Sequence, residues 1–219
     1  MTQFASLLQI SRLDEVALDK FGFDILQMME VAGKGFAEVL KKEEKIPGKK
    51  ILIICGSGHN GGDGLCAARY FSNLGATVDV ILASEKLKEA TYHQAKILRK
   101  MGIIPKKFDG RLSKADLIVD ALFGYNQTGE AKPPYDEIID KLNRSGMLIY
   151  AFDNPSGLDI ESGKATRFTI RAKATVTLAV IKKGLTVRLA QKYVGKLFLV
   201  DLGIPKIAYS EVGLKYPNF

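Results

Sequence analysis

The sequence predicts an α/β protein built on a mostly parallel sheet that carries helices on both faces. Apolar stretches of strand length alternate with helical patterns between residues 51 and 153, and this alternation is typical of parallel sheets. The stretch at residues 51–55, ILIIC, is continuously apolar, as expected for a strand buried on both faces. A glycine-rich loop at residues 56–64 then connects this strand to a helical stretch that Gly75 closes.

The same patterns predict the helices and strands before and after this strand–loop–helix unit. Residues 12–44 are helical by spacing, and Gly22 is expected to divide them into two helices. This segment is expected to pack on the outside of the domain or to serve an oligomer interface. Further helices are predicted at residues 65–75, 86–101 and 134–144, and further strands at residues 77–83, 116–124, 147–153, 173–180 and 196–201. The last two strands are expected to extend one edge of the sheet.

Composition excludes several classes of protein. The chain has 219 residues, of which 47% are hydrophobic and 26% charged, so it is not a disordered chain, a collagen or a coiled coil. No apolar run reaches the length of a membrane span, and the N-terminus lacks a basic leader, so we expect a cytoplasmic protein without membrane contact. Cys55 and Cys66 have neither disulfide-framework nor zinc-site spacing.

The net charge of +8 favours phosphate groups only mildly. The basic residues do not form a stripe interleaved with aromatic residues, so nucleic-acid binding is not expected.

Three loops follow predicted strand ends and carry unusual residues. They are residues 56–64, 120–130 and 153–157, and the carboxyl ends of parallel strands should bring them to one crevice. The first loop, GSGHNGGDG, offers backbone N–H groups to an anion such as a phosphate. Its Gly-x-Gly-x-x-Gly pattern alone is a weak dinucleotide signal, and the helical periodicity begins only at Leu65. Asn60 could bind a cation through its amide oxygen, and Asp63 could either cap the helix or contact a ligand.

The other two loops supply acidic and hydrogen-bonding groups. Asp120 lies inside an apolar run, where a carboxylate is costly unless it is paired or bound to a cation. Asp153 follows an apolar strand and opens the turn DNPSG. It could stabilise the turn or transfer a proton. Lys182 follows another apolar run, where a solvated lysine is the alternative to a functional one.

In order, the segments GSGHNGGDGLCAARY, VDALFG and AFDNPSGLDIESG resemble the NAD(P)H-hydrate epimerase family, also called the YjeF N-terminal domain. The N-terminal MMEVAG and the late ATVTLAVIKKGL and VGKLFLVDLGIP are also similar to that family. The resemblance runs from about residue 12 to residue 205. It implies a Rossmann-like three-layer α/β/α sandwich that forms a homodimer. It also implies an isomerase that interconverts the R and S hydrates of NADH and NADPH, called NADHX and NADPHX, for nicotinamide cofactor repair.

The resemblance also implies roles for particular residues. Asp153 is the expected acid/base, assisted by Lys182, and one potassium ion per subunit is expected on Asn60, Asp120 and Ser156. Contacts with the hydrate are implied for residues from three loops, namely His59, Asn60, Gly61, Gly62, Asp63, Gly124, Tyr125, Asn126, Gln127, Thr128, Gly129, Glu130 and Asp153. Three positions depart from the usual family pattern, namely His59, Ile181 and Val31. The change at Ile181 makes the role of Lys182 less secure.

We expect the 219 residues to form a single domain of this type, residues 1–219, without a fused dehydratase. A separate dehydratase that restores the cofactor is therefore the expected functional partner. Two alternatives stay open. One is a catalytically idle scaffold of the same fold that binds RNA or protein, and the other is an NAD-dependent oxidoreductase that uses Gly56, Gly58 and Gly61.

Overall fold

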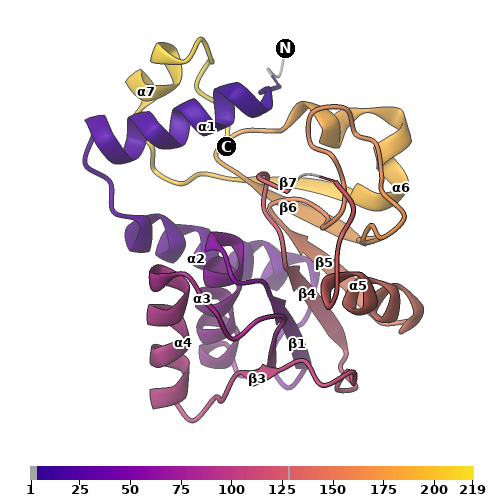
Figure 1. Cartoon of the computed structure of the whole chain (residues 1–219). Helices are drawn as coiled ribbons and strands as arrows, with labels where there is room; N and C mark the ends of the chain where they lie inside the picture. The colour runs from indigo at the N-terminus through magenta and orange to yellow at the C-terminus, as the bar shows by residue number, and fades with distance from the viewer. Residues whose placement is uncertain (1–3, 128) are drawn as a thin grey trace.

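The computed structural model describes residues 4–127 and 129–219. Its centre is a sheet of seven strands in the order β3-β2-β1-β4-β5-β6-β7, and all six neighbouring pairs are parallel. This confirms the predicted α/β class and places the last two strands at one edge (Figure 1). The strands are β1 (Lys50–Cys55), β2 (Thr77–Leu82), β3 (Lys106–Lys107), β4 (Leu117–Ala121), β5 (Leu148–Phe152), β6 (Ala174–Leu178) and β7 (Lys196–Val200).

Helices cover both faces of the sheet. They are α1 (Leu7–Glu15), α2 (Ile25–Glu43), α3 (His59–Asn73), α4 (Glu89–Lys100), α5 (Tyr135–Arg144), α6 (Gln191–Val194) and α7 (Lys206–Glu211), with a π-helical turn (Val16–Lys20) and two 3₁₀ turns (Lys183–Thr186, Arg188–Ala190). No helix in the described part of the chain is both long enough and apolar enough to span a bilayer. The short β3 and the helix α7 were not predicted from the sequence.

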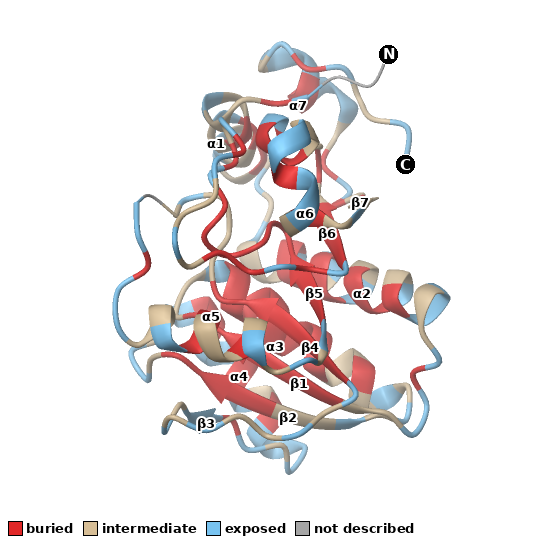
Figure 2. Ribbon diagram, turned by 90° about the vertical axis from the view of Figure 1, so that its right-hand side faces the viewer, coloured by how far each residue is buried: buried red, intermediate tan, exposed pale blue. Residues whose placement is uncertain are grey.

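The sheet separates two apolar layers because neighbouring residues of a strand point to opposite faces. Ile51 and Ile53 of β1 pack in the layer that α2, α3 and α4 cover. Leu52 and Ile54 pack in the layer that α5 covers. Every residue of β1 after the first is buried (Figure 2), which explains the continuous apolar run in the sequence.

Helix α3 begins at His59, not at Leu65 as the periodicity indicated. The reason is close packing of its first turns. A Cβ on Gly61 would lie 2.0 Å from the Gly56 carbonyl oxygen, and one on Gly64 would lie 2.5 Å from the Ala121 Cβ. These glycines therefore let the helix lie directly against the ends of β1 and β4. Apolar periodicity does not detect a helical turn whose inner face is glycine.

The N-terminal segment packs over the carboxyl ends of the strands. As predicted, Gly22 separates two helical stretches, and its φ of 69° is left-handed. Before α1, Ala5 forms a parallel bridge with Lys182. Its N–H donates to the Ile181 carbonyl at 2.9 Å, and its carbonyl accepts from the Lys183 N–H at 3.0 Å. These bonds fix α1 beside the segment that carries Lys182.

Glu44, at the end of α2, joins that helix to the sheet. Its carboxylate accepts hydrogen bonds from the Tyr150 hydroxyl at 2.5 Å and from Lys173 Nζ at 2.7 Å. The Lys173 hydrogen bond, followed by that of Tyr150, lowers the pKa of Glu44 from 4.5 to about 2.

We expect Glu44→Gln to destabilise the fold at pH 7 by about 1 kcal/mol, because the pair is partly solvated. The carboxylate stabilises the folded state above its unfolded pKa of 4.5, and this contribution is lost as the pH falls toward about 2. Urea unfolding at several pH values should therefore show the variant and the wild type converging below pH 4.5. A stability difference that does not change with pH would contradict the assignment.

Candidate active site

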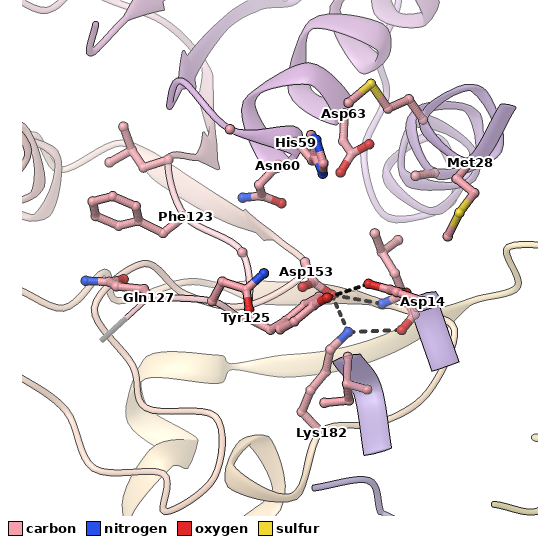
Figure 3. Close-up of a pocket in the computed structure, with 18 of the residues that line it drawn as sticks. Asp14, Met28, His59, Asn60, Asp63, Phe123, Tyr125, Gln127, Asp153 and Lys182 are labelled. Atoms are coloured by element: carbon pink, nitrogen blue, oxygen red, sulfur yellow. Dashed lines mark hydrogen bonds and ion pairs between the residues drawn. The ribbon is translucent and has the colours of Figure 1, made fainter. Parts of the chain in front are cut away.

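A cavity of about 550 Å³ opens at the carboxyl ends of the strands, within the size range of small-molecule sites. The first turn of α3 forms one wall, and the loop after β4 and the ends of β5 and β6 form others (Figure 3). The structure thus brings together residues from the first two predicted loops, the first residue of the third loop and the lysine that follows β6. The predicted residues that line the cavity are His59, Asn60, Asp63, Gly124, Tyr125, Asn126, Gln127, Glu130, Asp153 and Lys182.

Helix α3 presents its N-terminus and two buried polar side chains to the cavity. The first backbone N–H groups of a helix are free to bind an anion, and the helix dipole favours negative charge there. Asn60 is buried, and neither atom of its amide has a hydrogen-bond partner among the described residues. Buried polar groups are normally paired, so the Asn60 amide is suited to a ligand or an ion.

Asp63 lies one turn further along α3. The helix is capped by Gly58 without a side-chain bond, so the structure removes the capping role that the sequence left open for Asp63. The residue is only 9% exposed, and no hydrogen bond from the described part of the chain reaches its carboxylate. Burial, followed by the negative charge of Asp153, raises the pKa of Asp63 well above its ordinary value. A buried and unpaired carboxyl at a cavity wall is available to a ligand.

Asp153 and Lys182 form a buried ion pair on the facing side of the cavity. Lys182 is 2% exposed and Asp153 is 4% exposed. Lys182 Nζ donates to Asp153 Oδ1 and, at 3.0 Å, to the Leu178 carbonyl. Asp153 Oδ1 also accepts from the Leu178 N–H at 3.3 Å. Lys182 is therefore not the solvated lysine that the sequence allowed.

The backbone of Asp153 is itself unusual. Its φ of 68° is left-handed, a conformation that costs about 1–3 kcal/mol for a residue with a side chain. The Asp153 N–H donates to the Val176 carbonyl at 2.9 Å, which holds the residue beside β6. Strain of this kind persists where the surrounding structure fixes it, and it is common at functional sites.

Asp14 was not predicted as a site residue. It lies on α1, lines the cavity and accepts a hydrogen bond from the Tyr125 hydroxyl at 2.5 Å. Burial raises the pKa of Asp14. The available signal was an acidic residue on the same helix face as Ile10 and Ala17, both buried, since residues three and four apart share a face.

Asp120 and Ser156 do not line the cavity but lie behind its wall. The Ser156 hydroxyl donates to Asp120 Oδ1 at 2.7 Å, and the Ser156 N–H donates to Oδ2 at 2.9 Å. The Phe123 N–H donates to the Ser156 hydroxyl at 3.1 Å. Burial raises the pKa of Asp120 to about 6. The predicted second and third loops are therefore joined by this pair.

The remaining predicted contacts divide into three groups. Gly61 and Gly62 lie within α3 and pack against Gly56 and Met29, so they do not line the cavity. Gly129 does not line it either. Thr128 lies outside the described residues. Which of the predicted residues contact the hydrate stays a prediction.

Comparisons with known proteins show which proteins this chain is similar to. The family model described as YjeF-related protein N-terminus matches residues 25–184. An NAD(P)H-hydrate epimerase from Dehalogenimonas lykanthroporepellens is 37% identical, over 93% of this chain and 83% of the relative. The bifunctional NAD(P)H-hydrate repair enzyme Nnr of Coxiella burnetii is 34% identical, over 93% of this chain and 42% of the relative.

A likeness in fold comes from a solved yeast structure, YNL200c. It matches with a TM-score of 0.85 and 23% identity, over 99% of this chain and 96% of the yeast chain. The agreement supports the Rossmann-like α/β arrangement.

We expect Lys182→Met to destabilise the protein by about 3–5 kcal/mol, because it leaves the buried Asp153 carboxylate without its partner. Combining it with Asp153→Asn should recover much of that loss, since the unpaired charge is removed as well. Lys183→Met is a matched control, because the Lys183 side chain is 61% exposed. Urea unfolding of the wild type, Lys182→Met, Asp153→Asn and the double variant measures the coupling, and additive effects of the two substitutions would contradict a strong buried pair.

Proposed function

Because the chain belongs to the YjeF-related N-terminal family, we propose that it is an NAD(P)H-hydrate epimerase that interconverts the R and S hydrates of NADH and NADPH. The observation that carries the proposal is one cavity that joins a helix N-terminus suited to phosphate to the buried Asp153–Lys182 pair. The helix N-terminus suits the diphosphate of a dinucleotide. The Asp153–Lys182 pair suits proton transfer at the hydrated nicotinamide ring.

The reaction inverts one carbon. Water added across the nicotinamide ring places a hydroxyl on C6, and inversion needs the C6–O bond or the ring to open and to close again on the other face. Either route moves protons, so the site needs a fixed acid/base group. Asp153 meets this need because three donors, from Lys182, Leu178 and Thr177, surround its Oδ1. Lys182 holds the carboxylate in place and supplies positive charge beside it.

Binding of the substrate would divide between two walls. The N–H groups at the start of α3, with His59, would meet the phosphates. Lys88, whose N–H donates to the Ser57 carbonyl at 2.9 Å, lines the same wall and adds positive charge. Tyr125, Asn126 and Gln127 would contact the ligand from the loop after β4. Gln127 is held by the Gly157 N–H, which donates to its Oε1 at 2.7 Å.

Two observations support a bound potassium ion. The Asn60 amide oxygen is buried without a hydrogen bond from the described residues, and no cationic side chain among them forms an ion pair with the buried Asp120. Carboxylate, amide and hydroxyl oxygens suit a hard cation. Asn60, Asp120 and Ser156 would hold one ion per subunit. When bound, the ion would supply positive charge that stabilises the three loops and the bound substrate.

We also propose a homodimer that works with a separate dehydratase in the cytoplasm. The name of the Coxiella burnetii relative describes a bifunctional repair enzyme, and this chain matches 42% of its length. This supports a coupling between epimerisation and a second repair activity.

We expect Asp153→Asn to lower the rate of interconversion by at least about 100-fold, the usual contribution of an acid/base group. Chiral separation of the hydrates over time, with the uncatalysed rate subtracted, measures the change. Binding of the hydrate should stay measurable. Asp79→Asn is a suitable control, because Asp79 lies on β2 in an ion pair with Lys50, outside the cavity lining.

If Asp153→Asn kept full activity, this result would contradict the acid/base role of Asp153. A wild-type protein that binds the hydrates but does not interconvert them would overturn the epimerase and favour the idle scaffold. Reduction of NAD in the presence of alcohols would favour the oxidoreductase instead.

We expect potassium to raise the unfolding temperature of the wild type as its concentration increases, since a ligand that binds only the folded state stabilises it. Asn60→Ala should abolish most of this increase. Choline chloride at equal ionic strength controls for general salt effects. Equal responses of both proteins to potassium, or equal responses to potassium and choline, would contradict the site.

A further inference from the structure

Among the described carboxyl groups that line the cavity, Asp63 and Asp153 are the most deeply buried, and the proposed reaction does not yet use Asp63. We propose that Asp63 is a second proton-transfer group, which serves the face of the nicotinamide ring opposite to the face that Asp153 serves. This inference rests on the proposed function and deepens it. It concerns how the enzyme delivers and removes water on both faces of C6.

The two carboxyl groups come from different walls. Asp63 is carried by α3 and Asp153 by the end of β5, and both line the same cavity. Figure 3 shows the Asp63 side chain pointing from the helix toward the side that holds Asp153 and Lys182. A Cβ placed on Gly124 would lie 3.8 Å from Asp153 Oδ2 and 3.5 Å from the Asn60 Cβ. The absence of a side chain at Gly124 therefore keeps the space between the walls open.

A contact with phosphate explains Asp63 poorly. A carboxylate repels a phosphate, and the N–H groups available to an anion lie at the start of α3, before Asp63. A structural role does not explain the buried Asp63 either, because its side chain neither caps the helix nor accepts a hydrogen bond from the described residues. A buried group without a partner calls for an explanation, and a reacting ligand provides one.

The charges around the two groups differ in a way that suits opposite roles. Asp153 forms a buried ion pair with Lys182, and in the forward direction it is assigned the role of proton acceptor. Asp63 is faced by Asp153, Asp14 and Lys182 across the cavity, with the Cys55 thiol close by. Burial and the two carboxylates raise the pKa of Asp63, so its carboxyl can hold a proton. One group is thus set to donate and the other to accept.

In one direction, Asp63 gives its proton to the C6 hydroxyl, the C6–O bond breaks and water leaves with the bonding pair. The lone pair of N1 forms a C=N bond, which leaves one positive charge on the ring. A water molecule on the other face then bonds to C6, the C=N pair returns to N1, and Asp153 takes the proton of that water. Asp63 ends ionised and Asp153 protonated. Exchange with solvent at the exposed rim, beside Asn126 and Glu130, restores the starting state. The reverse reaction starts with Asp63 ionised and Asp153 protonated.

The test is oxygen exchange into each epimer in H₂¹⁸O, measured by chiral separation and mass spectrometry. The wild type must first interconvert the hydrates, and this step tests the proposed function separately. In Asp63→Asn we expect interconversion to fall at least about 100-fold. The epimer whose hydroxyl faces Asp153 should still exchange its oxygen, whereas the other epimer should not. In Asp153→Asn, the epimer whose hydroxyl faces Asp63 should still exchange its oxygen, whereas the epimer whose hydroxyl faces Asp153 should not.

Several outcomes would overturn the inference. Asp63→Asn could leave interconversion unchanged, or it could slow exchange equally in both epimers. The wild type could also interconvert the hydrates faster than it exchanges oxygen, which would mean that the C6–O bond does not break.

A second variant keeps the test independent of folding. Asp63→Ala should lose interconversion and regain part of it with added formate, a small carboxylic acid that can occupy the space left by the side chain. Asp159→Ala, in an exposed turn outside the cavity lining, is the control and should not respond to formate. No rescue in a folded Asp63→Ala that still binds the hydrate would count against proton transfer by Asp63.

Discussion

The buried ion pair between Asp153 and Lys182 is the interaction on which the rest of the site depends. Two charges are removed from water at the end of the sheet, and this is tolerated only where both have further partners. Leu178 supplies them from both backbone groups, since its N–H donates to Asp153 and its carbonyl accepts from Lys182. The left-handed turn at Asp153 and the bridge from Ala5 to Lys182 fix the two residues in this relation. Strain and buried charge are concentrated at one point of an otherwise regular sheet.

Much of the fold could be predicted because its signals are local. Continuous apolar runs marked the buried strands, and the residues at their ends marked the cavity. The start of α3 could not be predicted, because its inner face is glycine packed against Gly56 and Ala121, and this depends on contacts distant in sequence. Asp14 was missed for a similar reason, since its partner Tyr125 lies on a loop far along the chain.

The cavity also shows how the charges of one site depend on each other. Three carboxyl groups, Asp14, Asp63 and Asp153, share a single buried lysine among the described residues that line it. They cannot all stay ionised at low cost in such surroundings. The Tyr125 hydroxyl offsets part of the charge of Asp14, so the site as a whole keeps a proton within reach of its ligand.

The bridge between Ala5 and Lys182 has a consequence for how the molecule is made. The N-terminal part of a chain leaves the ribosome first, and a domain generally folds as a unit. Here the first strand-like residue has its partner beyond β6, and Tyr209 adds a hydrogen bond to the Ala179 carbonyl at 3.2 Å. In a nascent chain, Ala5 therefore lacks its partner Lys182 until the residues after β6 have been synthesised. The cavity is completed only when the last fifth of the polypeptide has emerged, so unfinished chains would be synthesised without a functional centre.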